Sequence, residues 1–287
     1  RKYLTLPNGI PSHDTFNRLF SLLAPEQFHD LFTQWVREIL LNSEPVTGII
    51  AVDGKTQRGS RISPTEVTHT VNAWSTQNGI CLGQTKVADK SNEITAVPEL
   101  LKKLAIKGCL VTADAMSCQK KIAKQILTQE ADYLLAVKNN QKTLYKAIDQ
   151  HFMAYWDEHA EDQPDDDGFS QQANKTHGRK EYRRCWVSGE LDSNPVFRQW
   201  GVSTLAAVQY DRVKGDKMSS YMRYFISSRP LEAEAVLQST RQHWAVENSL
   251  HWVLDVAFNE DQSLLLSTNG VKSLSLVINA NASILPL

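Results

Sequence analysis

Two aspartates and one glutamate occupy positions from which they could bind the same divalent metal ion. Asp53 and Asp114 each end a short apolar, β-branched run, at residues 46–52 and 109–113. In open α/β sheets, ligand-binding groups collect beyond the carboxyl ends of the strands. Glu247 lies in a stretch whose apolar residues recur every three or four positions, which predicts a helix. Carboxylate oxygens are preferred ligands of Mg²⁺ and Mn²⁺, so convergence of these acids would give a site for one or two such ions.

The chemistry of such a site would be phosphoryl transfer. Two divalent ions can activate a water or hydroxyl group and stabilise the leaving oxygen. A more ordinary interpretation is that acids after strands are helix caps and turn residues, and spacing alone favours it because acids in turns are common. Glu247 adds weight to the metal site, since a carboxylate within an apolar helical face is costly to bury unless a cation meets it.

Cations and amides cluster beside the predicted strand ends and on the predicted helix. The stretches at 53–61, 138–141 and 177–184 each carry several of them. Each stretch alone is typical of a solvated loop. Together they could supply the local positive patch that DNA binding needs, which the net charge of −1 does not supply. The candidate DNA contacts are Lys55, Arg58, Lys138, Asn140, His177, Arg179, Arg241, His243 and Asn248.

The predicted helix also carries histidines and tryptophans. His243, Glu247 and His251 stand four positions apart on one face, but the zinc motif H-E-x-x-H is absent. A packed or surface role is therefore favoured over metal binding for both histidines. For Trp244 and Trp252, core packing is favoured over stacking on DNA bases.

The composition is that of an ordinary globular protein. Of the 287 residues, 41% are hydrophobic and 22% are charged, and the length could hold one large domain or two modest ones. No apolar run reaches the ~18 residues of a membrane-spanning helix. The four cysteines are scattered without a C-x-x-C pair, which favours reduced thiols in a cytoplasmic protein over disulfides or a zinc site. The fingerprints of dinucleotide binding and of serine hydrolases are absent.

The elements that must position the acids follow from the apolar patterns. Three strands are predicted first, at residues 46–52, 67–75 and 80–87. Helices and strands then alternate along residues 93–156, which predicts a mixed α/β sheet with helices packed on it. After an acidic linker at 158–167, three more strands are predicted, at residues 180–190, 203–213 and 218–227. A long helix is predicted over residues 231–258.

Several of these stretches resemble, in the same order, the ISAs1 family of transposases, which includes the H-repeat-associated proteins of enteric bacteria. The resemblance extends from about residue 9 to residue 261. The stretches that carry it are residues 49–56, 89–94, 114–119, 136–141, 177–179 and 243–252. Several long motifs in one order make the resemblance specific.

The resemblance implies a DDE transposase with an RNase H-like core and a β-rich insertion before the glutamate. By position, the catalytic and metal-binding triad would be Asp53, Asp114 and Glu247. The family chemistry is Mg²⁺-dependent (or Mn²⁺-dependent) strand cleavage at transposon ends, followed by strand transfer into target DNA. The implied partner is DNA, and no membrane is involved. The protein is expected in the bacterial cytoplasm, and at the nucleoid when it is bound to DNA. Two copies of the chain could act together as a homodimer in the DNA complex.

The resemblance also suggests how the chain is divided. Residues 1–45 would be a helical N-terminal segment, and 46–157 the first part of the RNase H-like core. Residues 158–230 would be the acidic linker and β-rich insertion, and 231–287 the catalytic helix with the C-terminal part of the core.

Two alternatives to an active transposase stay open at this stage. The first is a degenerate, catalytically inactive remnant that at most binds DNA. It is favoured by the tail, where residues 262–266 (Gln-Ser-Leu-Leu-Leu) stand in place of the arginine-rich run expected of the family. The second alternative is a metal-dependent nuclease without strand transfer.

Overall fold

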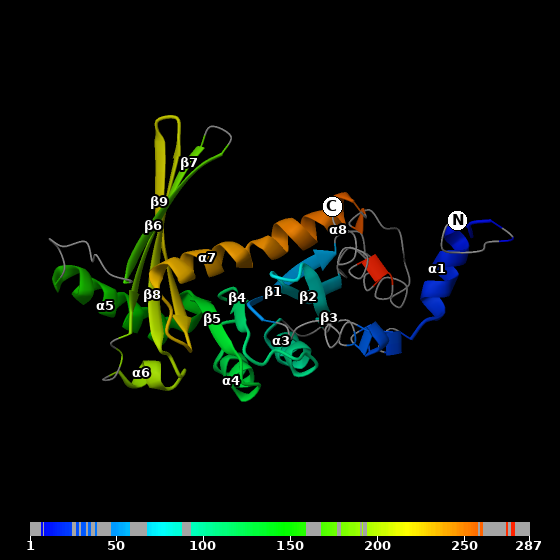
Figure 1. Cartoon of the computed structure of the whole chain (residues 1–287), viewed down its shortest axis with the longest axis horizontal. Coiled ribbons are helices and arrows are strands. Elements are labelled where there is room, and N and C mark those ends of the chain that lie inside the picture. Colours follow the sequence, from blue (N-terminus) through cyan, green and yellow to red (C-terminus); the bar gives the residue numbers. More distant parts are fainter. Residues whose placement is uncertain are drawn as a thin grey trace.

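One nine-stranded sheet runs through the part of the chain that the computed structural model describes (Figure 1). The described residues are 7, 9–24, 27, 28, 30–32, 34, 35, 38, 47–57, 68–87, 93–158, 168–176, 179–189, 191, 194–257, 259, 260, 274, 277 and 278. The strands are β1 (Ile49–Gln57), β2 (Thr68–Ser75), β3 (Ile80–Lys86), β4 (Leu110–Ala113), β5 (Asp132–Val137), β6 (Phe169–Thr176), β7 (Arg179–Ser188), β8 (Thr204–Lys214) and β9 (Lys217–Ser227). Their order across the sheet is β3-β2-β1-β4-β5-β9-β8-β7-β6.

The first five strands form a mixed sheet. Strands β1, β4 and β5 run parallel, whereas β2 and β3 are added to β1 as antiparallel neighbours. The predicted hairpin between β2 and β3 is confirmed: its turn ends at Gly79, whose φ of 64° favours glycine. The Ser75 hydroxyl donates to the Asn78 side chain and fixes this turn.

Helices cover both faces of this mixed sheet. The helical elements of the described residues are α1 (His13–Leu22), α3 (Glu93–Lys102), α4 (Lys120–Thr128), the 3-10 turn η2 (Asn139–Gln141), α5 (Lys142–Glu158), α6 (Pro195–Arg198), α7 (Ala233–His243), the π-helical turn η3 (Val246–His251) and α8 (Trp252–Val256). Because side chains alternate along a strand, Ile50 and Val52 of β1 pack with α3, α4 and α5, whereas Ile49 and Ala51 face α7 and η3. In Figure 1, α7 crosses one side of the sheet and α3 and α4 lie on the other.

The arrangement is an RNase H-like fold, which confirms the fold implied by the resemblance. Its antiparallel hairpin, parallel strands and helical crossovers are those of the predicted α/β core. Helix α3 precedes β4 and helix α4 connects β4 to β5, as expected of connections between parallel strands. The predicted division of the chain at residues 45, 157 and 230 stays a prediction.

The strands of the region 158–230 continue the same sheet. Strand β9 pairs antiparallel with β5 through Val137 and Tyr224, and β8, β7 and β6 follow outward as long hairpins (Figure 1). Three of these strands match the predicted ones. Strand β6 was not predicted, because its polar sequence (FSQQANKT) lacks alternating apolar residues and is held in the sheet by its pairing with β7.

The long helix predicted over residues 231–258 is interrupted. Helix α7 ends at His243, and the next regular turn, η3, is π-helical before α8 begins at Trp252. π-helical turns are rare and frequently occur at functional sites. Glu247 lies within this turn.

The N-terminal segment begins its helix as predicted. The Ser12 side chain accepts a hydrogen bond from the Thr15 N–H and caps α1. No residue of α1 is buried, and Figure 1 shows this helix away from the sheet. No helix among the described residues has the length and apolar character that crossing a membrane requires.

Candidate active site

The three acids predicted from the sequence line one cavity of about 600 Å³. Val52 of β1 and Ala113 of β4 form the last parallel pair between these strands. Asp53 and Asp114 follow this pair directly, at the carboxyl end of the parallel strands. Glu247 reaches the same cavity from η3, on the face of the sheet that α7 covers. The fold therefore brings together three carboxylates from distant parts of the chain.

The side chain of Asp114 is held by its own loop. One carboxylate oxygen, Oδ1, accepts the backbone N–H groups of Met116 at 3.0 Å and Ser117 at 3.2 Å. This is the turn role that acids after strands often have. The ordinary interpretation of Asp114 is thus correct for one oxygen, and it does not conflict with a second role at the cavity.

The charge of the acids is poorly compensated. Burial raises the pKa of Asp53 from 3.8 to about 7. A hydrogen bond from the Gly54 backbone acts in the opposite direction, and the charges of Asp114, Glu93 and Glu247 raise the pKa further. Carboxylates that repel one another in a half-buried place favour a bound cation.

The donor set fits a hard divalent ion such as Mg²⁺ or Mn²⁺, because it consists of carboxylate oxygens. Within the described residues, no group of three or more His, Cys, Asp or Glu side chains could hold a metal ion in its present geometry.

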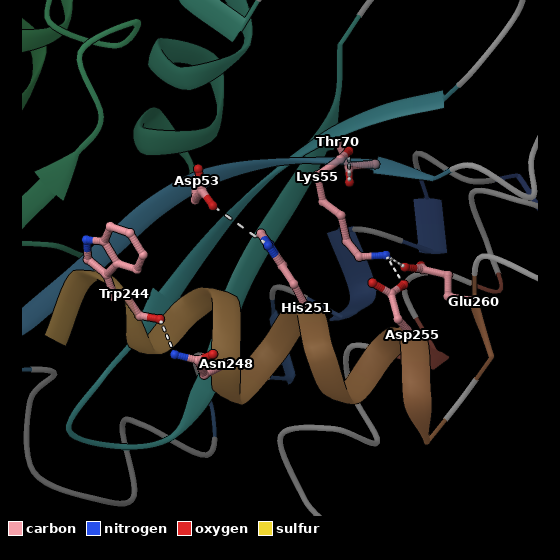
Figure 2. Close-up of polar contacts among 8 residues, drawn as sticks. All are labelled: Asp53, Lys55, Thr70, Trp244, Asn248, His251, Asp255 and Glu260. Atoms are coloured by element: carbon pink, nitrogen blue, oxygen red, sulfur yellow. Dashed lines mark hydrogen bonds and ion pairs between the residues drawn. The ribbon is translucent and has the colours of Figure 1, made fainter. Parts of the chain in front are cut away.

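His251 lies beside Asp53 on the η3 side of the sheet. Figure 2 shows its ring directed at Asp53, and the distance between Nδ1 and Asp53 Oδ2 is 3.7 Å. Only 8% of the residue is exposed, and among the described residues Nε2 has no hydrogen-bond partner. Burial, and then the charge of Lys55, lower the pKa of His251 to about 4. A neutral ring next to Asp53 leaves the negative charge of the acids in place.

Lys55 has a structural role instead of the predicted contact with DNA. The side chain is buried, and its ammonium group donates to Asp255 Oδ1 at 2.6 Å and to Glu260 Oε2 at 2.7 Å (Figure 2). These two acids follow η3 in the chain, so the ion pairs attach the end of the Glu247 segment to the strand of Asp53. We therefore do not carry Lys55 forward as a contact to phosphate.

Cationic and aromatic side chains line the same cavity as the acids. Lys138, at the end of β5, is exposed and lines the cavity, and its contact with phosphate stays a prediction. Arg223 of β9 lines it too, and its guanidinium lies 5.2 Å from the ring centre of Tyr221 and 5.6 Å from that of Trp244. The prediction of core packing for Trp244 is wrong: 46% of it is exposed, because Val246 and Leu250 supply the buried positions of this segment.

Trp252 is likewise exposed, at 57%, and not packed in the core as predicted. Arg223 was missed by the sequence reasoning because no motif marks it. The available signal was its position two residues after Tyr221, on the same face of a strand.

A second cavity of about 580 Å³ adjoins the first and shares Tyr221, Thr240 and Trp244 with it. Arg241 and Asn248, both exposed, line this second cavity together with Arg183 and Arg212. Arg241 and Asn248, the predicted DNA contacts near Glu247, therefore lie on an exposed surface.

The other predicted DNA contacts have different surroundings. His243 lines the first cavity, and its Nδ1 forms a hydrogen bond with the Thr112 hydroxyl at 3.0 Å. Asn140 donates to the Ala115 carbonyl oxygen at 2.6 Å and so braces the loop after Asp114. Arg58 and His177 lie outside the described residues, as does the side chain of Arg179.

Comparison with known proteins agrees with this geometry. Residues 44–282 match the family described as "Transposase DDE domain", and residues 1–36 match the one described as "DDE_Tnp_1-associated". The chain belongs to the DDE transposase family. The first match alone covers most of the chain, and it contains all three acids of the cavity.

Two similar proteins come from Escherichia coli. The protein is 39% identical to the Escherichia coli K12 "H repeat-associated putative transposase YhhI", over 96% of this chain and 73% of the relative. It is 41% identical to "Putative transposase YncI" of Escherichia coli O157:H7, over 96% of this chain and 70% of the relative. These relatives confirm the resemblance to H-repeat-associated transposases.

Proposed function

We propose that this DDE-family protein is a DNA transposase that cleaves strands at transposon ends and joins them to target DNA. The observation that carries the proposal is the convergence of Asp53, Asp114 and Glu247 on one cavity of an RNase H-like fold. Family membership supplies the reaction class. The substrate class is DNA, and the reaction would take place in the bacterial cytoplasm, with two copies of the chain on paired ends.

The three acids would hold one or two divalent ions, Mg²⁺ or Mn²⁺. When bound, such ions activate an oxygen nucleophile and stabilise the leaving oxygen of a phosphodiester. The chain itself supplies the fixed frame. Asp53 and Asp114 extend from adjacent parallel strands, and the Asp114 carboxylate is oriented by two backbone N–H groups. Such prior orientation lowers the cost of reaching the reactive geometry.

Cations around the cavity would hold the DNA backbone. Lys138 and Arg223 border the acids, and Arg241 lies on the adjoining cavity, so a strand crossing both cavities would meet all three. Phosphate contacts of this kind position DNA and make binding dependent on salt. The aromatic rings beside Arg223 give the same surface apolar area for sugars and bases.

Cleavage of the DNA ends that flank the gene tests the proposal. With Mg²⁺, the chain should nick these ends. Asp114→Asn and Glu247→Gln should each lower the rate by at least about 100-fold, since removing one charge-stabilising group typically costs that much. Asp216→Asn, at the exposed β8–β9 turn, is the matched control and should cleave like the parent chain.

The same assay separates the alternatives. Absence of metal-dependent cleavage by the folded parent chain would support an inactive remnant and refute the proposal. Cleavage without joining of the freed 3′ end to a second DNA would support a nuclease.

A further inference from the structure

Asn72 of β2 is a buried polar side chain beside Asp53. The two residues lie directly opposite each other in the antiparallel pairing of β1 and β2. The neighbours of Asn72 along the strand, Val71 and Ala73, pack in the core on the α3 face, so Asn72 is directed to the face that η3 covers. Residues directly opposite each other in such a pair have Cβ atoms roughly 4.5–5.5 Å apart. The amide of Asn72 is therefore within reach of the Asp53 carboxylate.

Packing does not explain why this position carries an amide. Only 1% of Asn72 is exposed, and among the described residues neither its Nδ2 nor its Oδ1 has a hydrogen-bond partner. Most buried polar side-chain atoms are paired, and an unpaired one destabilises the fold. An apolar side chain of similar size would fill the same space without this cost. We therefore look for the role of Asn72 in its effect on Asp53.

His251 approaches Asp53 from η3, on the same face of the sheet. Its Nδ1 lies 3.7 Å from Asp53 Oδ2, and Figure 2 shows the ring directed at the carboxylate. This distance is longer than a hydrogen bond, but hydrogen bonds in active sites are often long before the substrate binds and then tighten. Because burial and the charge of Lys55 lower its pKa to about 4, the ring is neutral near pH 7. A proton on Nδ1 would let it donate to Asp53 without adding charge.

The place of His251 is fixed by contacts before and after it in the chain. Leu250 and Leu254 belong to a buried cluster with residues of β1 and β2. The ammonium group of Lys55 then holds Asp255 at 2.6 Å, which attaches α8 to β1 (Figure 2). A ring held in this way can orient a neighbouring carboxylate, because its own position is already fixed.

We propose that Asn72 and His251 are positioning residues for Asp53, which direct neutral N–H groups at its carboxylate from the η3 face. The proposal rests on the proposed function, since Asp53 is one of the acids that would bind the metal ion. Neutral donors orient a carboxylate and leave its negative charge available to a cation, whereas a lysine or arginine would neutralise it. Asn72 was missed by the sequence reasoning because no motif marks it.

Asn72→Leu tests the proposal, because a packing role and a positioning role predict different results. Leucine has a similar volume and needs no hydrogen-bond partner, so Tm from circular dichroism should equal or exceed that of the parent chain. The affinity for Mn²⁺, measured by calorimetry without DNA, should fall at least on the order of tenfold, as for other partners of metal-binding groups.

Gln84→Met is the matched control for Asn72→Leu. Gln84 is buried and lies directly opposite Asn72 on β3, so it is one strand farther from Asp53 on the same face. The control variant should bind Mn²⁺ like the parent chain. A lower affinity in Asn72→Leu alone would therefore depend on the distance from Asp53 and not on the loss of a buried amide as such.

Two substitutions of His251 test which atom acts. Asparagine places an amide nitrogen near the position of Nδ1 and keeps a donor there, whereas leucine removes it. His251→Asn should bind Mn²⁺ nearly as well as the parent chain, and His251→Leu should bind it at least on the order of tenfold more weakly. Equal affinities of these two folded variants would contradict a role of the Nδ1 donor.

The proton of His251 can also be located in the parent chain, without any substitution. Above pH 7 the Asp53 carboxylate is ionised and can only accept a hydrogen bond. Nitrogen-15 NMR of metal-free, histidine-labelled protein should then show the proton on Nδ1. An Nδ1 without a proton would overturn the proposal even if the leucine variants did not fold.

The outcomes distinguish this inference from the proposed function. If Asp114→Asn weakens Mn²⁺ binding but Asn72→Leu or His251→Leu does not, only this inference is overturned. If the folded parent chain does not bind Mn²⁺, or binds it independently of Asp114, the proposed function falls and this inference falls with it.

Discussion

Replacing Lys55 by methionine separates its structural role from a role in DNA binding. The buried ammonium group is held by Asp255 and Glu260, whose side chains are 38% and 5% exposed. Methionine would fill much the same volume without the charge. Glu260 would then be a buried carboxylate that has lost the ammonium group of Lys55, whereas water would still screen part of the charge of Asp255.

The expected loss of stability follows from this difference in exposure. Breaking a fully buried ion pair costs roughly 3–5 kcal/mol. Because Asp255 is partly solvated, we expect about 3 kcal/mol for Lys55→Met, most of it from Glu260. In a chain of this size 1 kcal/mol corresponds to roughly 2–4 °C in Tm. The variant should therefore melt about 6–12 °C below the parent chain.

Thermal unfolding followed by circular dichroism measures this loss. Lys102→Met is the matched control, since it removes an exposed pair with Glu99 and should cost at most about 1 kcal/mol. Adding Glu260→Gln to Lys55→Met should recover part of the loss, because it removes a buried charge that has lost its ion pair with Lys55. An unchanged Tm for Lys55→Met, accompanied by weaker DNA binding, would refute the structural role and restore the contact to phosphate.

Three further predictions concern the acid site, the cavity wall and the core. Asp53 has a pKa of about 7 in the folded chain and an ordinary value near 3.8, so the folded state binds more protons than the unfolded state between these pH values. Without metal, the stability of the chain should therefore fall as the pH rises from 4 to 7. Tm measured over this pH range should show the fall in the parent chain and not in Asp53→Asn. Arg223→Gln should weaken DNA binding and lower the slope of log affinity against log salt by roughly 1; an unchanged slope would argue against a phosphate contact. Tyr133→Phe should cost about 1–2 kcal/mol in urea unfolding, because the buried hydroxyl donates to the Trp200 carbonyl oxygen at 2.7 Å. Equal stability of this variant and the parent would contradict that hydrogen bond.

The parts of the fold that have a local signal could be predicted from the sequence. Asp53 and Asp114 could be found because each ends an apolar run, and parallel strands bring such ends to one edge of a sheet. Glu247 could be found from its helical pattern. The meeting of these three acids in one cavity could be inferred only from the family resemblance or from the structure. No local sequence pattern determines which face of the sheet a distant helix covers.

Features that depend on distant contacts could not be predicted. Strand β6 is polar and exists because it pairs with β7. Lys55 follows a candidate catalytic acid and so suggested a phosphate contact, but its partners are 200 and 205 positions away. Arg223 reaches the cavity from β9, which is added to the sheet beside β5. Its surroundings, not its spacing in the sequence, distinguish it.

The pairing of β5 with β9 has a consequence for the growing chain. Val137 of β5 pairs with Tyr224, which follows 87 positions later (224 − 137). At a synthesis rate of roughly 5–20 residues per second, the free edge of β5 would wait about 4–17 seconds for its partner strand. That edge carries the apolar sequence Leu134–Val137, and unpaired apolar edges are sites of aggregation. A nascent chain that stopped before β9 would keep this edge open, so chaperones should recognise prematurely ended copies through β5.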